Sequence, residues 1–410
     1  MPVIKPFHAI LPSADKVDRV VINLENLSLK SAKEVRAINE DSFVHLLIPK
    51  IENYYLRGSK QELAFQKIAE NFEDFINQGI LLKDKEPAIY IYQQEKEGKS
   101  YTGIWTVSSI DDYINNSIKK HELTRPERER GLIEYLQQTG IDANPVLITY
   151  PPHQELELII CSVLTNAPSL DFTQDKVNHR IWKVNEEEKM DKICELFSQM
   201  KQSYIADGHH RAAAASTFGI ERRKLNLKHQ GNEEYNFFSS VYISANQLEI
   251  LPFHRFIKLD TLIADEAILS FIKENFEIQE IEKEALIPTK AHYLGLYFNH
   301  KSYSINLNVK LKNEVLHDLD VSLLQHYLLE PMFGMNNPRE DKRLNFIGGE
   351  IALNQHLKEI DKGIYDLAFF LYPTAIDDLM KIADLGETMP PKSTWFEPKF
   401  PAGLITHEIK

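Results

Sequence analysis

One short stretch constrains the fold of this chain more than any other. Residues 204–215 read YIADGHHRAAAA: an apolar run, an Asp-Gly turn, two histidines, an arginine and four alanines. This order predicts a strand that enters a helix through a tight turn. The first turn of a helix leaves backbone N–H groups without partners, and the helix dipole makes that end positive. The stretch therefore predicts an anion site, with phosphate as the commonest occupant.

The side chains of the stretch suit such a site. Gly208 lets the backbone approach a ligand closely, because it has no Cβ. Arg211 can donate two hydrogen bonds to phosphate oxygens, and His209 and His210 add donors or handle a proton near neutral pH. The residues alone leave a second interpretation open, in which Asp207 only caps the helix and both histidines are structural or solvated.

Length and composition limit the class of protein. A chain of 410 residues is longer than a chain that usually folds around one hydrophobic core, so two or three domains are expected. With 47 basic and 60 acidic residues the net charge is −13, which argues against nucleic acid as a partner. No membrane association is expected, because no apolar run reaches spanning length and the first residues lack the apolar core of a signal peptide. Cys161 and Cys194 lack metal-type spacing, and we expect two buried thiols in a cytoplasmic protein.

The alternation of strand-like and helical patterns predicts a mixed α/β (α+β) fold. Because repeats and low-complexity linkers are lacking, changes of pattern place the boundaries. They give an N-terminal α/β region at 1–115, a central core at 116–258, and a C-terminal α/β region at 259–410 with a Pro- and Lys-rich tail.

Individual elements are also predicted. Strands are expected at 42–48, 88–93 and 156–164, helices at 60–79 and 111–122, a hairpin over 236–259 that turns near Ala245-Asn246, and a strand pair at 292–298 and 302–307. Thr124 and Glu127 have the spacing of a capping box, with Pro126 in the first turn of a helix that ends at Gly140.

The stretch DGHHR entering a helix resembles the signature of the ParB/sulfiredoxin-like superfamily, which includes nucleotide-binding partition proteins, sulfiredoxins and free-serine kinases. The serine kinases are the more similar, because they also carry a His-Glu pair ahead of a helix, matched here by His121-Glu122. Sulfiredoxins have a cysteine where His209 or His210 stands, so sulfinic acid reduction is not expected. Over its whole length the chain resembles a bacterial family catalogued as a domain of unknown function, through blocks that include SFVHLL, LPFHRF and MPPKSTWFEPKFPAGL.

The resemblance implies a small-molecule kinase that uses ATP or ADP to phosphorylate a serine-like metabolite. Glu122 would be the base on the substrate hydroxyl with His121 beside it, and Asp207 would hold Mg²⁺ against the phosphates. This requires Glu122 to return to the Asp207 turn.

Further candidates for the phosphate site are the residues His254, Arg255 and, from the tail, Lys392. Two alternatives remain open at this point: a nucleotide-binding switch or scaffold without turnover, and a phosphatase or phosphotransferase that uses His209 or His210 as the nucleophile. The acceptor, the choice of nucleotide and the oligomeric state are not fixed by the sequence.

Overall fold

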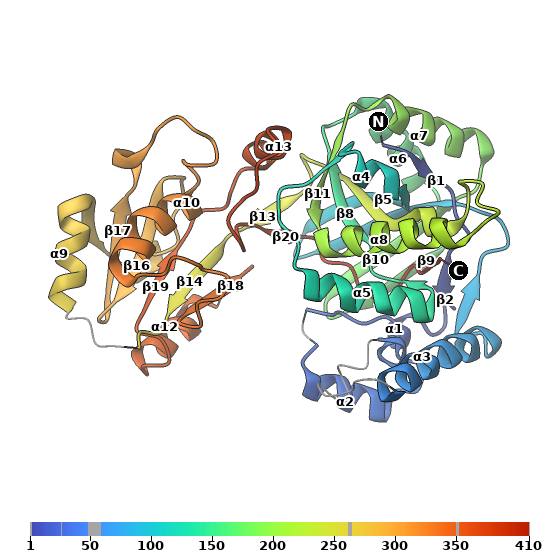
Figure 1. The fold of residues 1–410 in the computed structure, drawn as a ribbon, viewed down its shortest axis with the longest axis horizontal. Helices are drawn as coiled ribbons and strands as arrows, with labels where there is room; N and C mark the ends of the chain where they lie inside the picture. The colour runs from blue at the N-terminus through green and yellow to red at the C-terminus, as the bar shows by residue number, and fades with distance from the viewer. Residues whose placement is uncertain (1, 26, 48–58, 261–264, 350–351, 410) are drawn as a thin grey trace. The chain divides into compact units, whose positions relative to one another are not determined.

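The computed structural model describes residues 2–25, 27–47, 59–260, 265–349 and 352–409. The chain forms two compact units (Figure 1), unit 1 from Met1–Leu248 with Pro398–Lys410, and unit 2 from Glu249–Glu397. Both units mix helices and strands, which confirms the predicted α/β class.

The two units differ from the three regions expected at 1–115, 116–258 and 259–410. Strands from the first two regions hydrogen-bond within one sheet, so they cannot be separate units. The chain also returns to unit 1 at Pro398, after unit 2 is complete.

Unit 1 is built on a nine-stranded sheet with the order β6-β11-β8-β12-β5-β4-β10-β9, and β1 pairs β5 off this path. Its β6–β11 and β8–β12 pairs are parallel and the others are antiparallel. The strands are β1 (Ile4–Lys5), β4 (Ile89–Lys96), β5 (Lys99–Ser109), β6 (Ile118–Lys119), β8 (Val146–Tyr150), β9 (Leu170–Gln174), β10 (Val177–Val184), β11 (Ser203–Asp207) and β12 (Phe237–Ser244). The strand predicted at 88–93 is thereby confirmed as β4.

Helices cover this sheet, and α5 and α8 lie side by side against it (Figure 1). One apolar core joins the sheet to the helices through residues such as Leu136, Ile160, Phe197 and Phe218. The helices are α4 (Ile110–Ile114), α5 (Pro126–Thr139), α6 (Gln154–Leu164), α7 (Glu187–Gln199) and α8 (His209–Leu225).

A second core in unit 1 joins the beginning of the chain to its end. It contains Phe43, Phe72, Ile141 and Ala402 among its buried residues. The elements around it are β2 (Ile10–Pro12), α1 (Val17–Val20), α2 (Leu29–Ile38), the short 3₁₀-helix η1 (Phe43–Leu46), α3 (Ser59–Asn77), β3 (Leu81–Lys83), β7 (Ile141–Asp142) and β21 (His407–Glu408). The helix predicted at 60–79 is confirmed as α3.

Two predicted strands are helical. Residues 156–164 belong to α6, where the buried residues Leu156, Ile160 and Val163 follow helical spacing. Residues 43–46 form η1, because the Ser42 side chain accepts a hydrogen bond from the Val44 N–H and caps a helical turn. The last residue of the predicted strand at 42–48 lies outside the described residues.

The segment ahead of α5 also differs from prediction. The expected helix at 111–122 ends at Ile114, and the chain passes through Asn116 with φ 64° into β6. The N-cap residue of α5 is Arg125, whose side chain makes no capping hydrogen bond, so the predicted capping box of Thr124 and Glu127 is wrong. Pro126 does begin the helix, and Gly140 ends it at φ 72°, as predicted.

Unit 2 contains a six-stranded sheet with the order β15-β17-β16-β19-β14-β18 and a separate β13–β20 pair. The predicted hairpin over 236–259 is wrong, because β12 belongs to the sheet of unit 1 and β14 to that of unit 2. The predicted pair at 292–298 and 302–307 is confirmed as β16 and β17. The strands are β13 (Glu249–Leu251), β14 (Phe253–Ile257), β15 (Glu277–Ile281), β16 (Tyr293–Phe298), β17 (Lys301–Asn306), β18 (Leu344–Gly348), β19 (Leu367–Phe370) and β20 (Trp395–Glu397). The helices are α9 (Asp265–Asn275), α10 (Asp320–Leu324) continued by a π-helical turn (Gln325–Leu329) and α11 (Glu330–Phe333), then α12 (Leu353–Asp361) and α13 (Ile376–Asp384).

Candidate functional site

The parallel pair β6–β11 brings the two predicted motifs together. Ile118 pairs with Ser203 and Lys119 with Tyr204 at the edge of the sheet. Parallel strands end at the same edge of a sheet, so the residues that follow β6 meet those that follow β11. Glu122 therefore does return to the turn that begins α8.

Two buried histidines form the centre of this meeting point. The rings of His121 and His209 are nearly perpendicular, with centroids 4.4 Å apart, and the two residues are 3% and 4% exposed. The His121 backbone N–H donates to Nε2 of His209 over 3.4 Å. A neutral imidazole that accepts at Nε2 carries its proton on Nδ1, and this nitrogen lies 3.9 Å from Oε2 of Glu122.

Both histidines are neutral at pH 7. Burial lowers the pKa of His121 to about 4. Burial, and then the neighbouring His121, lower the pKa of His209 well below its ordinary value. The neutral His209 ring thus lies beside the Glu122 carboxylate, 3.9 Å away and beyond hydrogen-bond distance, and Glu122 itself is reachable, with 39% of its side chain exposed.

A second contact ties the chain ahead of α5 to α8. The Arg125 backbone N–H donates to Nδ1 of His210 over 3.3 Å. The proton of a neutral His210 ring then lies on Nε2. Both motif histidines are therefore bonded to backbone groups of the segment that carries Glu122.

The turn into α8 requires its glycine. Gly208 has φ 100°, and a Cβ at this position would lie 2.9 Å from Nε of Arg211. The Gly208 carbonyl accepts from the N–H groups of Arg211 and Ala212 over 2.9 and 3.1 Å. The N–H groups of Gly208, His209 and His210 come before the first hydrogen-bonded turn, at the positive end of the helix. This is the geometry of an anion site.

Charged side chains cluster beside this turn. The Arg211 guanidinium donates to Oδ1 of Asn144 and to the Pro145 carbonyl, and its Nη2 lies 3.2 Å from Oδ2 of Asp207. Lys399 Nζ lies 3.5 Å from the same oxygen. Although burial alone would raise the pKa of Asp207, the charges of Lys399 and Arg211 hold it below its ordinary value.

Lys399 has a second carboxylate partner, because its Nζ also lies 3.5 Å from Oε1 of Glu25. The tail residue at this turn is Lys399, whereas the sequence pattern had pointed to Lys392. Glu25, Asn144 and Lys399 were missed because each comes from a different segment, and only the tertiary fold brings them together.

Three other predicted site residues, His254, Arg255 and Lys392, belong to unit 2. The Arg255 guanidinium donates to the carbonyls of Phe253 and Lys392 over 2.7 and 3.0 Å. Nδ1 of His254 accepts from the Leu371 N–H over 3.1 Å. Both side chains are buried within β14, where they satisfy backbone groups of unit 2.

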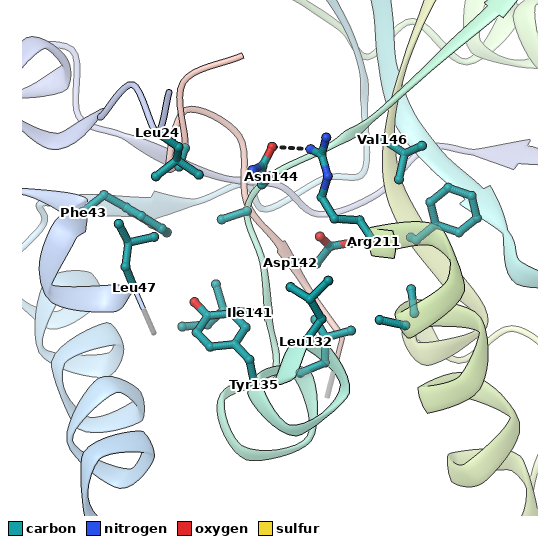
Figure 2. Close-up of a pocket in the computed structure, with 16 residues that line it drawn as sticks. Leu24, Phe43, Leu47, Leu132, Tyr135, Ile141, Asp142, Asn144, Val146 and Arg211 are labelled. Atoms are coloured by element: carbon teal, nitrogen blue, oxygen red, sulfur yellow. Dashed lines mark hydrogen bonds between the residues drawn. The ribbon is translucent and has the colours of Figure 1, made fainter. Parts of the chain in front are cut away.

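An apolar cavity of about 140 Å³ lies next to Arg211 (Figure 2). Figure 2 shows Arg211 and Asn144 at its polar end and side chains from η1 and α5 around the rest. Asp142 also reaches it, and its Oδ2 accepts from the Ser239 N–H over 2.7 Å. Other lining residues are Leu24, Phe43, Leu47, Leu132, Tyr135, Leu136, Ile141, Ala143, Val146, Ala214, Ala215, Phe238 and Ala402. The small side chains of α8 thus leave space beside the charged cluster.

Within the described ranges, no group of three or more His, Cys, Asp or Glu side chains is arranged to hold a metal ion. No described helix combines the length and apolarity needed to cross a membrane. Cys161 is exposed and Cys194 partly buried. The expectation of two buried thiols is wrong for Cys161, because its segment is a helix that turns this side chain outward.

Comparisons with known proteins find distant structural likenesses and one family. The chain is similar to a free serine kinase in complex with AMP (16% identity, 75% of this chain and 91% of that chain covered, TM-score 0.38). It is also similar to a conserved hypothetical protein from Pyrococcus furiosus (16% identity, 73% of this chain and 93% of that chain covered, TM-score 0.36). A third similar structure is SbnI with a C-terminal truncation from Staphylococcus aureus (10% identity, 72% of this chain and 84% of that chain covered, TM-score 0.38). No curated protein matches the chain. The model of the family described as "Protein of unknown function (DUF1015)" matches residues 4–322, which is more than half of the chain, and the protein therefore belongs to that family.

Proposed function

We propose that the protein is a small-molecule kinase that transfers a phosphoryl group from ATP or ADP to the hydroxyl of a serine-like metabolite. In this proposal the region around α8 is a ParB/sulfiredoxin-like core. The observation that carries the proposal is the position of Glu122, 3.9 Å from His209 at the start of α8. A carboxylate beside a helix N-terminus is what phosphoryl transfer to an alcohol needs.

Each residue has a distinct task in the transfer. The N–H groups at the start of α8 hold the terminal phosphate, and Gly208 leaves room for it. The substrate oxygen attacks the terminal phosphorus, the bond to the bridging oxygen breaks, and the hydroxyl proton passes to the Glu122 carboxylate. The neutral His209 ring beside Glu122 does not compete for this proton, because burial holds the pKa of His209 well below its ordinary value.

The charges around the turn support a requirement for Mg²⁺. The carboxylates of Glu25, Glu122 and Asp207 outnumber the cations Arg211 and Lys399, while His121 and His209 are neutral. A polyphosphate therefore needs a divalent cation that accompanies it. Both ion pairs of Asp207 end at Oδ2, so Oδ1 can serve as the single carboxylate ligand that Mg²⁺ often takes beside phosphate oxygens. Bound there, Mg²⁺ would neutralise charge on the transferred group.

Glu122→Gln tests the role of the base. It should lower turnover at least about 100-fold and leave nucleotide binding intact, because the amide keeps the size of the side chain. The matched control is Glu127→Gln, an exposed carboxylate in the first turn of α5, which should leave turnover unchanged. Product is measured by ³¹P NMR with hydroxylated amino acids, ATP or ADP, and Mg²⁺.

Other outcomes separate the alternatives. Normal turnover in Glu122→Gln would exclude this residue as the base. A thermal shift with nucleotide but no product in a broad metabolite screen would favour a nucleotide-binding switch or scaffold. A phosphohistidine intermediate on His209 is disfavoured by geometry, because its Nε2 accepts from the His121 N–H and its Nδ1 faces Glu122. No shift with any nucleotide would refute the kinase proposal.

A further inference from the structure

We propose that Lys399, supplied by the C-terminal segment, is the resident cation of the site: a positioning residue that holds Asp207 and Glu25 together where a divalent ion would otherwise bridge them. Its ammonium lies 3.5 Å from an oxygen of each carboxylate. Only 20% of the Lys399 side chain is exposed. The role in phosphoryl transfer rests on the function proposed above, but the role as resident cation does not.

The C-terminal segment is fixed firmly enough to place this charge. The Phe400 ring packs against Tyr92 and Trp105, with centroids 5.6 and 5.8 Å apart. The Ala402 N–H donates to the Ile22 carbonyl over 2.9 Å. A Cβ on Gly403 would lie 2.3 Å from the Phe43 ring, so the backbone passes directly against that side chain. Lys399 is therefore anchored by its neighbours on the C-terminal side.

The electrostatics make this lysine more than a surface charge. Asp207 and Glu25 share one ammonium, and the pKa of Asp207 lies below its ordinary value even though its burial acts in the opposite direction. Without Lys399, the carboxylates of Asp207 and Glu25 would lose the ammonium that they share, while Arg211 would stay bonded to Asp207. Losing this shared charge increases the repulsion between the two carboxylates and favours the entry of another cation. Lys399 also lies beyond the residues matched by the family model, so the tail completes a site that the matched region begins.

Divalent-ion binding tests the resident cation without any reference to nucleotide. Mn²⁺ is titrated and followed by electron paramagnetic resonance in wild type, Lys399→Met and Lys399→Arg, with folding checked by circular dichroism. Lys399→Met should bind Mn²⁺ at least about tenfold more tightly than wild type, and Lys399→Arg should behave as wild type. Adding Asp207→Asn to Lys399→Met should abolish the gain.

The matched control is Lys83→Met. Lys83 also binds a carboxylate of the C-terminal segment, with its Nζ 2.6 Å from Oε2 of Glu408, but it does not touch Asp207 or Glu25. It should not alter Mn²⁺ affinity. A folded Lys399→Met that binds Mn²⁺ no more tightly than wild type, or an equal gain in Lys83→Met, would overturn the proposal.

A second titration addresses the link to function. Mg²⁺ with ADP should bind Lys399→Met at least about tenfold more weakly than Lys83→Met, if the ordered Asp207 is needed for the nucleotide. Failure of wild type to bind any nucleotide refutes the kinase function, and the Mn²⁺ result still decides the role of Lys399. Tight ADP binding by Lys399→Met together with the Mn²⁺ gain would confirm the resident cation and refute its part in nucleotide binding.

Discussion

Acidification should destabilise unit 1 through its buried histidines, among them His121 and His179, which lie far apart in the sequence. His121 packs against His209, and His179 is stacked on Phe172 with centroids 4.9 Å apart while its Nδ1 lies 2.7 Å from the Tyr92 hydroxyl. Burial lowers the pKa of both His121 and His179 from 6.5 to about 4. The folded state therefore holds these protons less tightly than the unfolded state.

The sign and size follow from this difference. The contribution of each histidine to the stability of the folded state is fully present above pH 6.5. It falls as the pH drops below that value and is lost completely below about pH 4. For each histidine the free energy of unfolding should decrease by about 2 kcal/mol between pH 7 and pH 5. Replacing either one should remove its share of the decrease, whatever it does to stability at pH 7.

Tryptophan fluorescence can report on unit 1 alone. Of the three tryptophans, Trp395 is in unit 2, so a Trp395→Phe background leaves Trp105 and Trp182 as reporters. Urea unfolding at pH 7 and pH 5 is compared for this parent and for His179→Gln. The exposed His8, replaced by Gln, is the control and should keep the full decrease. A decrease in His179→Gln equal to that of the parent would refute the argument.

Two further predictions concern packing and thiol chemistry. Gly295→Ala should destabilise unit 2 by about 3 kcal/mol, because its Cβ would lie 1.8 Å from the Leu286 carbonyl oxygen. Gly131 lies within α5, and a Cβ there would have no described atom within 4 Å. Gly131→Ala should therefore stabilise unit 1 by up to about 1 kcal/mol. Equal changes in the free energy of urea unfolding for the two variants would contradict the packing argument. In a native thiol titration the exposed Cys161 should react quickly. Cys194 should react slowly, because burial raises its pKa to about 11; a fast phase that persists in Cys161→Ser would be inconsistent with this assignment.

Local chemistry made the centre of the site predictable. The turn at Asp207-Gly208 and the helix after it follow from backbone preferences within a few residues, and Gly140 ends α5 for the same kind of reason. The strand prediction for residues 156–164 was wrong because a short apolar run fits a buried strand and a buried helix equally well. Only the contacts of Leu156 and its helical neighbours decide between the two.

The sequence could not predict which distant segments of the chain come together at the site. Nothing in the tail distinguishes Lys399 from Lys392, since both are lysines near prolines. They differ because Lys392 belongs to unit 2, whereas Lys399 belongs to the segment that returns to unit 1. The pairing of Glu122 with the α8 turn likewise depends on β6 and β11 being neighbours, which periodicity cannot show.

The return of the chain at Pro398 has a consequence for synthesis. Ala402 belongs to the same core as Phe43 and Phe72, and β21 pairs with β7. A ribosome must therefore deliver all of unit 2 before unit 1 can close its second core and receive Lys399. During that interval the nascent chain exposes apolar surface near its start, which makes it a candidate client for chaperones and proteases. A chain truncated after Leu248, at the boundary of unit 1, should leave the same apolar core exposed permanently.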